Sequence, residues 1–178
     1  MHGTEDPSAW IQRWSHLVPS RQPVLDVACG AGRHMRWFRE QGHPVVGVDR
    51  SPEAIAAVAG LGEALCADLE GGRWPWPGRS FGGVVVTNYL WRPLFPTLLQ
   101  SVAAGGVLIY ETFAAGNETV GKPSRPEFLL QPGELLRLCS GLRVIAFEDG
   151  YLEQPARFVQ RIAAVRPAGA GAAPRYRL

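Results

Sequence analysis

The chain has 178 residues, of which 46% are hydrophobic and 19% charged, and its formal net charge at pH 7 is +2. This length suits one globular domain, and the composition excludes a chain that is disordered throughout. The small net charge and the lack of a basic run argue against a nucleic-acid-binding protein. No apolar stretch reaches the roughly 18 residues of a membrane-spanning helix, and the start does not resemble a signal peptide.

The cysteines bear on the compartment and on metal binding. Cys29, Cys66 and Cys139 are odd in number and far apart in the sequence. This spacing favours neither a disulfide framework nor a zinc cluster. We therefore predict a cytoplasmic protein without a metal site.

The first predicted element is a helix near the start of the chain. Asp6 followed by Pro7 favours a helix start, with the acid as N-cap and the proline in the first turn. Apolar residues then repeat at helical spacing and form one stripe. The stripe consists of Trp10, Ile11, Trp14, Leu17 and Val18.

Short apolar, β-branched segments alternate with helical segments along the rest of the chain. The predicted strands span 23–28, 44–49, 63–68, 81–87, 106–113, 142–149 and 157–165. The predicted helices span 33–41, 51–59, 94–104 and 132–139. Apolar strands separated by helices are typical of a parallel sheet covered on both faces.

The last two strands have no helix between them, so they should form an antiparallel hairpin. The sequence thus predicts an α/β fold with a seven-stranded, mostly parallel sheet, an antiparallel C-terminal strand and helices on both faces. We expect a single domain over residues 1–166. Residues 167–178 are low in complexity and are predicted to form a flexible tail.

The segment VLDVACGAGRH, residues 24–34, contains a glycine loop preceded by an acid inside a strand. Gly30 and Gly32 fit the dinucleotide fingerprint G-x-G-x-x-G, but Met35 stands at its third position. Asp26 would repel a pyrophosphate and would favour a cation. The segment therefore disfavours a nicotinamide oxidoreductase and indicates a nucleoside ligand that carries positive charge.

LDVACGAG resembles the first motif of the class I S-adenosylmethionine-dependent methyltransferases, and the resemblance spans about residues 20–165. It implies a Rossmann-like sheet and S-adenosyl-L-methionine as cofactor. It further implies that Asp49 binds both ribose hydroxyls and that Asp68, with Leu69 as an apolar neighbour, meets the adenine amine. The predicted cofactor-binding set is Asp26, Gly30, Gly32, Asp49, Asp68 and Leu69. The three acids should meet at one edge of the sheet, because each follows the previous one by about one strand-helix unit.

The segment TNYLWRP, residues 87–93, borders the methyl group and the acceptor in the resembled family. Tyr89 and Trp91 would either form an aromatic wall against the sulfonium or pack in the core. Glu111 would either act on the acceptor or bond the following loop. His16 could approach an acceptor only if the first helix folds over the cleft. Tyr89, Glu111 and His16 are thus the catalytic candidates, and no dedicated base is evident.

Residues 116–136 are similar to a segment of small bacterial methyltransferases related to the tellurite-resistance enzymes. Because no added recognition domain is evident, we predict a small-molecule acceptor. An RNA or protein methyltransferase and a nonenzymatic cofactor-binding protein remain alternatives. Helices placed like that of residues 1–19 often cover the cofactor cleft in the resembled family. This helix is therefore either a lid or a permanently packed element.

Overall fold

The computed structural model describes residues 6–169 and 174–178 and contains one seven-stranded sheet in the order β3-β2-β1-β4-β5-β7-β6. Its strands are β1 (Val24–Val27), β2 (Val45–Asp49), β3 (Glu63–Cys66), β4 (Phe81–Thr87), β5 (Val102–Phe113), β6 (Arg143–Glu153) and β7 (Ala156–Val165). Strands β1 to β5 pair in parallel, and β7 runs antiparallel to both β5 and β6. The predicted fold class is confirmed.

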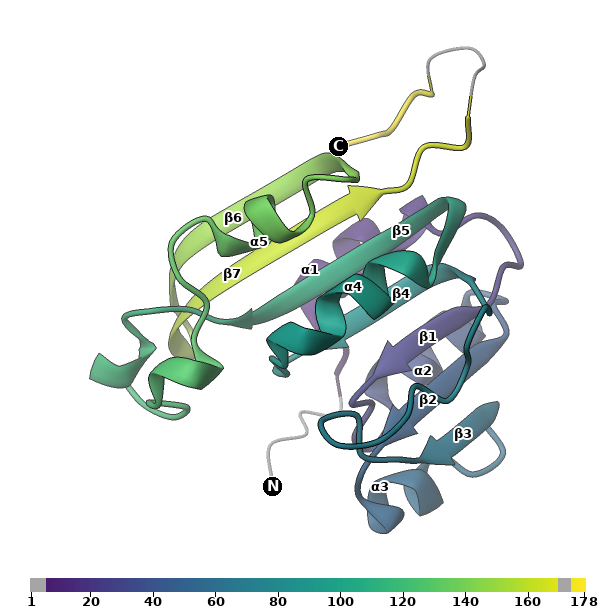
Figure 1. Cartoon of the computed structure of the whole chain (residues 1–178), viewed down its shortest axis with the longest axis horizontal. Helices are drawn as coiled ribbons and strands as arrows, with labels where there is room; N and C mark the ends of the chain where they lie inside the picture. Colours follow the sequence, from purple (N-terminus) through teal and green to yellow (C-terminus); the bar gives the residue numbers. More distant parts are fainter. Residues whose placement is uncertain (1–5, 170–173) are drawn as a thin grey trace.

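Short helices cover both faces of this sheet (Figure 1). They are α1 (Ala9–Trp14), α2 (Arg33–Glu40), α3 (Pro52–Ala57), α4 (Phe95–Gln100) and α5 (Glu134–Leu138). In Figure 1, α4 and α5 lie in front of the sheet, and α1 and α2 lie behind it. Side chains alternate between the faces along each strand, so each face has its own buried cluster.

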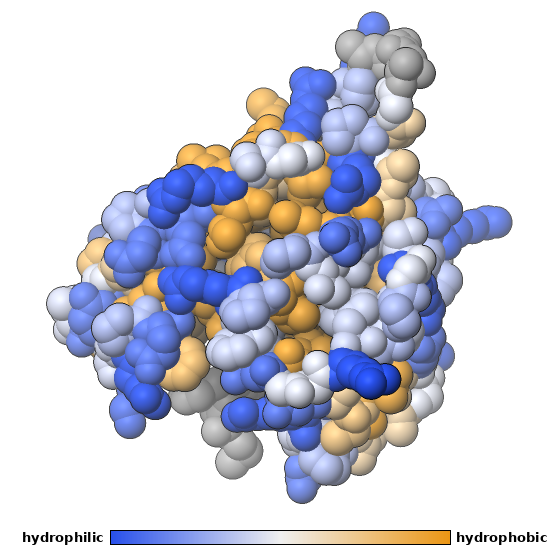
Figure 2. All heavy atoms as spheres, in the orientation of Figure 1, coloured by the Kyte–Doolittle hydropathy of each residue, from blue (hydrophilic) through white to orange (hydrophobic). Residues whose placement is uncertain are grey.

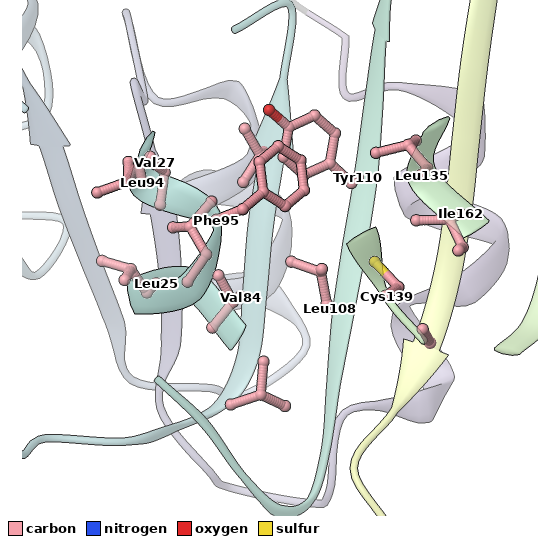
Figure 3. Close-up of a cluster of buried hydrophobic side chains, with 14 of the residues drawn as sticks. Leu25, Val27, Val84, Leu94, Phe95, Leu108, Tyr110, Leu135, Cys139 and Ile162 are labelled. Carbon is pink, nitrogen blue, oxygen red and sulfur yellow. The ribbon is translucent and has the colours of Figure 1, made fainter. Parts of the chain in front are cut away.

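The cluster under α4 and α5 is drawn in Figure 3. Phe95 of α4 stacks on Tyr110 of β5 with ring centroids 5.1 Å apart, and both rings are buried. The Tyr110 hydroxyl donates a 2.6 Å hydrogen bond to the Tyr89 carbonyl. This bond fixes the backbone just beyond β4, at the edge of the sheet where the site lies. Figure 2 shows hydrophobic side chains over the middle of this face and hydrophilic ones around them.

The opposite cluster contains the N-terminal helix. Trp10, Ile11 and Trp14 are 2%, 0% and 1% exposed, and they pack with Met35 and Phe38 of α2. The Trp10 indole also donates to the Ile162 carbonyl of β7 at 3.3 Å. The buried stripe predicted from helical spacing is thus largely present.

The predicted start of that helix was wrong. Helix α1 begins at Ala9, and its N-cap is Ser8, whose hydroxyl accepts a hydrogen bond from the Trp10 N–H. Asp6 and Pro7 precede the helix. Serine satisfies the free N–H groups of a first turn as well as aspartate does, so the Asp-Pro pair did not decide the boundary.

Strand β5 begins earlier than predicted. The expected helix over 94–104 ends at Gln100, and Val102 already pairs with Phe81 of β4. The Arg166 guanidinium donates to the Val102 carbonyl at 2.8 Å and thereby fixes the first residue of the strand. The final hairpin is also longer than predicted, because β6 and β7 continue pairing up to the turn at 154–155.

The predicted tail includes residues 170–173, which lie outside the described part of the chain. Farther on, the Arg143 guanidinium of β6 lies over the Tyr176 ring at 5.3 Å. The Arg177 carbonyl lies 3.2 Å from Nε2 of His16. Residues 174–178 therefore contact the domain. Among the described residues, no helix has the length and apolar character needed to cross a membrane.

Candidate functional site

Two adjoining cavities lie at the carboxyl ends of the parallel strands. The smaller has a volume of about 230 Å³ and the larger about 1170 Å³. Ala28, Tyr89, Glu70 and Phe128 line both, so the two form one continuous cleft. Open α/β sheets bind their ligands at this edge.

The smaller cavity contains two of the three predicted acids and their apolar neighbour. It is lined by Ala28, Val48, Asp49, Arg50, Ala67, Asp68, Leu69, Glu70, Tyr89 and Phe128. Asp49 ends β2, and its two carboxylate oxygens accept 2.9 Å hydrogen bonds from the N–H groups of Gly30 and Ser51. Each oxygen keeps a lone pair for a ligand hydroxyl. Asp68 is exposed at the rim, where it accepts from the Glu70 N–H at 2.9 Å.

The glycine loop between β1 and α2 adopts backbone conformations that explain both glycines. Gly30 has φ +52° and Gly32 φ +76°. A Cβ on Gly32 would lie 2.3 Å from Cγ1 of Val58, so this position requires glycine for packing. A Cβ on Gly30 would meet no atom within 4 Å. Gly30 lines the larger cavity, so its missing side chain leaves room for a close ligand.

Asp26 is buried in β1, with only 2% of its surface exposed. One carboxylate oxygen, Oδ2, has no hydrogen-bond partner among the described residues. Burial raises the pKa of Asp26 to about 7; Arg33 opposes this rise and Asp49 adds to it. Asp26 lines neither cavity, and the neighbouring Arg33 only partly offsets the cost of burying its carboxylate. The chemistry of this carboxylate suits a cationic ligand group.

His34 lies beside Asp26 at the start of α2. Its Nδ1 is 3.9 Å from Asp26 Oδ2, which is too long for a hydrogen bond. The Ser8 N–H donates to His34 Nε2 at 3.1 Å, so the neutral ring carries its proton on Nδ1. Burial, together with nearby Arg33, lowers the pKa of His34 to about 3. The ring is therefore neutral at physiological pH.

Glu111 belongs to the same buried network and does not line either cavity. Its Oε1 accepts a 2.9 Å bond from the Ser8 hydroxyl, and its Oε2 accepts a 3.2 Å bond from Arg161. Arg157 lies 3.7 Å from Oε1. The carboxylate thus links the N-terminal segment to β7.

The remaining catalytic candidates have different positions. Tyr89 lines both cavities, and its buried hydroxyl has no partner among the described residues. Burial raises the pKa of Tyr89, and the carboxylates of Glu70 and Asp68 raise it further. Trp91 packs against the core cluster under α4 and lines neither cavity. His16 is exposed and lies outside both cavity linings.

Backbone strain lies at the same edge. Ala28 and Asn88 both have φ +54°, a conformation that costs a residue with a Cβ about 1–2 kcal/mol. They directly follow β1 and β4, and both line the larger cavity. Such strain is typical of ligand sites.

Several cleft residues were not predicted from the sequence. Phe128 comes from the loop after β5, and Arg157 comes from β7. Ser8 and His34 pair across 26 positions. The N-cap preference of serine was the one available signal for Ser8. Within the described residues, no group of three or more His, Cys, Asp or Glu side chains could hold a metal ion.

The sequence of residues 24–105 matches a protein family described as "Methyltransferase domain". This stretch contains the glycine loop and the three predicted acids, Asp26, Asp49 and Asp68. Over this stretch the chain is similar to methyltransferase domains. The match bears out the predicted resemblance to methyltransferases.

Solved structures of methyltransferases share the fold. TehB from Haemophilus influenzae has a TM-score of 0.72 and 16% identity, over 88% of this chain and 61% of that one. A methyltransferase from Mesorhizobium loti has a TM-score of 0.70 and 18% identity, over 92% and 100% of the chains. The glycopeptide N-methyltransferase MtfA, crystallised with S-adenosylmethionine, has a TM-score of 0.62 and 20% identity, over 90% and 93%. The present chain thus spans less than two thirds of TehB. No curated protein matches its sequence.

Proposed function

We propose that this protein transfers the methyl group of S-adenosylmethionine to a small organic acceptor. The proposal is carried by one arrangement: Asp26, Asp49 and Asp68 lie in or just after three adjacent parallel strands, and the last two line the cleft. Asp26 is buried, and its Oδ2 has no hydrogen-bond partner among the described residues. An acid in that position is costly unless a cation meets it.

Each wall of the cleft has a part in this proposal. Asp26 would face the ammonium group of the cofactor, and Asp49 would accept hydrogen bonds from the ribose hydroxyls. Asp68 would meet the adenine amine, with Leu69 against the ring. The open space over Gly30 would admit the cofactor close to the backbone. S-adenosylmethionine supplies an activated methyl group on a positively charged sulfur.

The chain's own residues favour alignment and exclusion of water over proton transfer. Apart from the exposed Glu70, the side chains of the larger cavity that could act as a base are His34, Cys29 and Tyr89; His34 is neutral and already accepts a bond from Ser8. Burial raises the pKa of Cys29 to about 12, and the pKa of Tyr89 is raised as well. We infer that the acceptor presents a nucleophile that is already unprotonated. The enzyme then has to align the two reactants and exclude water from them.

The size and lining of the larger cavity support a small acceptor. About 1170 Å³ must hold part of the cofactor as well as the acceptor. Its wall combines Tyr89, Leu90, Phe113, Phe128 and Pro123 with polar groups. This mixture suits a compact molecule with an apolar body. The cytoplasmic location remains a prediction.

Removal of the Asp49 carboxylate tests the ribose assignment. We expect Asp49→Ala to weaken S-adenosylhomocysteine binding about 10- to 100-fold, because bonds to a charged acceptor are worth about 1.5–3 kcal/mol. Calorimetry measures the affinity, and circular dichroism monitors the fold. Asp49 also bonds the Gly30 and Ser51 N–H groups, so Asp49→Asn serves as a control that retains one amide oxygen. Unchanged affinity in a folded Ala variant would refute the assignment.

The RNA methyltransferase alternative makes a different prediction. With a net charge of +2, the protein should bind single-stranded and duplex RNA only weakly at physiological salt. Fluorescence anisotropy over a salt series measures this binding. Tight binding with a steep salt dependence would favour RNA over a small acceptor. Transfer of labelled methyl to a metabolite extract, and not to RNA or protein, is the expected complementary result.

A further inference from the structure

The larger cavity has an unbalanced set of charges. Its lining contains the cations Arg33, Arg36, Lys122 and Arg157, whereas Glu70 is its one carboxylate. The side chains of Arg36 and Lys122 form no hydrogen bond or ion pair with any described residue. Glu70 also lines the smaller cavity, on the nucleoside side of the cleft. The wall built from the 114–131 loop and β7 is therefore cationic.

The buried acid behind this wall does not neutralise it. Glu111 accepts a hydrogen bond from Arg161 at 3.2 Å, while Arg157 lies farther away at 3.7 Å. Arg161 is also bonded to Glu148 and lies over the Trp10 ring at 4.8 Å. Arg161 thus has a structural role. Glu111 pairs with Arg157 only at 3.7 Å, a distance too long for a hydrogen bond.

Arg157 is the guanidinium of this wall, and it donates no hydrogen bond to a described residue. Its side chain is 23% exposed, and its Nε is buried without a hydrogen-bond partner in the described chain. No described residue accepts a hydrogen bond from its guanidinium, which has five N–H donors in a planar fork. A half-buried guanidinium whose N–H groups lack acceptors is suited to a carboxylate or phosphate. It can bind such a group with two parallel hydrogen bonds.

We propose that Arg157, assisted by Lys122, binds an anionic group on the methyl acceptor, so that the acceptor is an organic anion with an apolar body. This inference rests on the proposed methyltransferase function and specifies its substrate class. Burial lowers the pKa of Arg33, and the neighbouring charge of Arg157 contributes to the decrease. Two cations held this close attract an anion more strongly than either alone. The aromatic residues Phe113 and Phe128 line the same cavity and would pack on the apolar body.

The test uses three probes that share one ring and differ in charge. Benzoate, benzamide and benzylamine are titrated by ligand-observed NMR into the full chain saturated with S-adenosylhomocysteine. We expect benzoate to bind about tenfold more tightly than benzamide, and benzylamine to bind most weakly. The factor corresponds to one charged hydrogen-bond pair in a partly solvated cleft. Phenyl phosphate, run in parallel, distinguishes a carboxylate from a phosphate preference.

Variants of the wall assign the effect to Arg157. Arg157→Gln should abolish the preference for benzoate, Arg157→Lys should retain part of it, and Lys122→Ala should reduce it. Arg137→Ala is the control, because Arg137 is an exposed cation of α5 that lines neither cavity. Equal binding of the three probes, or a preference unaffected by both Arg157→Gln and Lys122→Ala, would overturn the inference.

S-adenosylhomocysteine binding distinguishes a failure of the acceptor inference from a failure of the proposed function. If the wild-type protein binds S-adenosylhomocysteine but shows no preference for anionic probes, the acceptor inference fails and the methyltransferase proposal stands. If it does not bind S-adenosylhomocysteine, the proposed function itself fails.

Discussion

Replacement of Trp10 by alanine is expected to lower the free energy of unfolding by about 3–5 kcal/mol, the usual cost of truncating a buried aromatic residue. Trp10 is 2% exposed, makes an edge-on contact with Trp14 at 5.6 Å and donates to the Ile162 carbonyl. Urea denaturation measures the change. Gln12→Ala, on the exposed side of the same helix, should change stability by less than about 0.5 kcal/mol.

Deletion of residues 1–17 separates the two interpretations of this helix. The deletion would expose the sheet face under α1. It would also remove Ser8, which bonds both His34 and Glu111. We therefore expect aggregation or a large fall in melting temperature, as for a permanently packed element. A lid would instead leave a folded protein that binds S-adenosylhomocysteine and transfers methyl poorly. A soluble and fully active deletion variant would contradict both interpretations.

The sequence predicted the sheet well because its signals are local. The run 81–87 ends in four β-branched residues, Val84 to Thr87, and β4 has these bounds in the structure. Boundaries set by distant partners were less predictable. The start of β5 at Val102 depends on Arg166, which lies 64 positions away in the sequence. The first turn of α1 depends on a choice between Asp6 and Ser8 that propensity alone does not make.

The same distinction applies to the cleft. Asp26, Asp49 and Asp68 could be located from the sequence, since parallel topology places the carboxyl ends of successive strands at one edge. Arg157 could not, because β7 reaches the cleft through an antiparallel pairing with β5 that only the completed sheet defines. The environment of Glu111 was equally hidden, because its partners Ser8 and Arg161 lie 103 and 50 positions away.

The second large effect concerns Asp26 and the pH dependence of stability. Burial raises the pKa of Asp26 in the folded protein from 3.8 to about 7. Between pH 4 and 7 the unfolded chain therefore loses this proton while the folded protein keeps it, so wild-type stability declines as the pH rises through this range. Asp26→Asn removes this decline. We expect the variant to gain up to about 4 kcal/mol over the wild type between pH 4 and pH 8, and most of the gain to appear by pH 7.

The comparison of the two proteins isolates this carboxyl group. His34, whose pKa is lowered to about 3, reduces the stability of both proteins as the pH falls below about 6.5, and its contribution cancels in the difference. Urea denaturation of both proteins from pH 4 to pH 8 gives the curve. A difference that stays constant with pH would show that Asp26 ionises normally in the folded protein.

Binding should show the opposite dependence on Asp26. Because the ionised carboxylate is the form that meets an ammonium group, wild-type affinity for S-adenosylhomocysteine should rise as the pH increases towards about 7 and then level off. Below that pH, binding should release a proton, which calorimetry in buffers of different ionisation enthalpy detects.

Asp26→Asn should abolish the proton release and weaken binding about 10- to 100-fold. Adenosine lacks the ammonium group, so its affinity should hardly change. Equal losses for both ligands would mean that Asp26 only shapes the loop, and the stability gain of the variant would then have no counterpart in function.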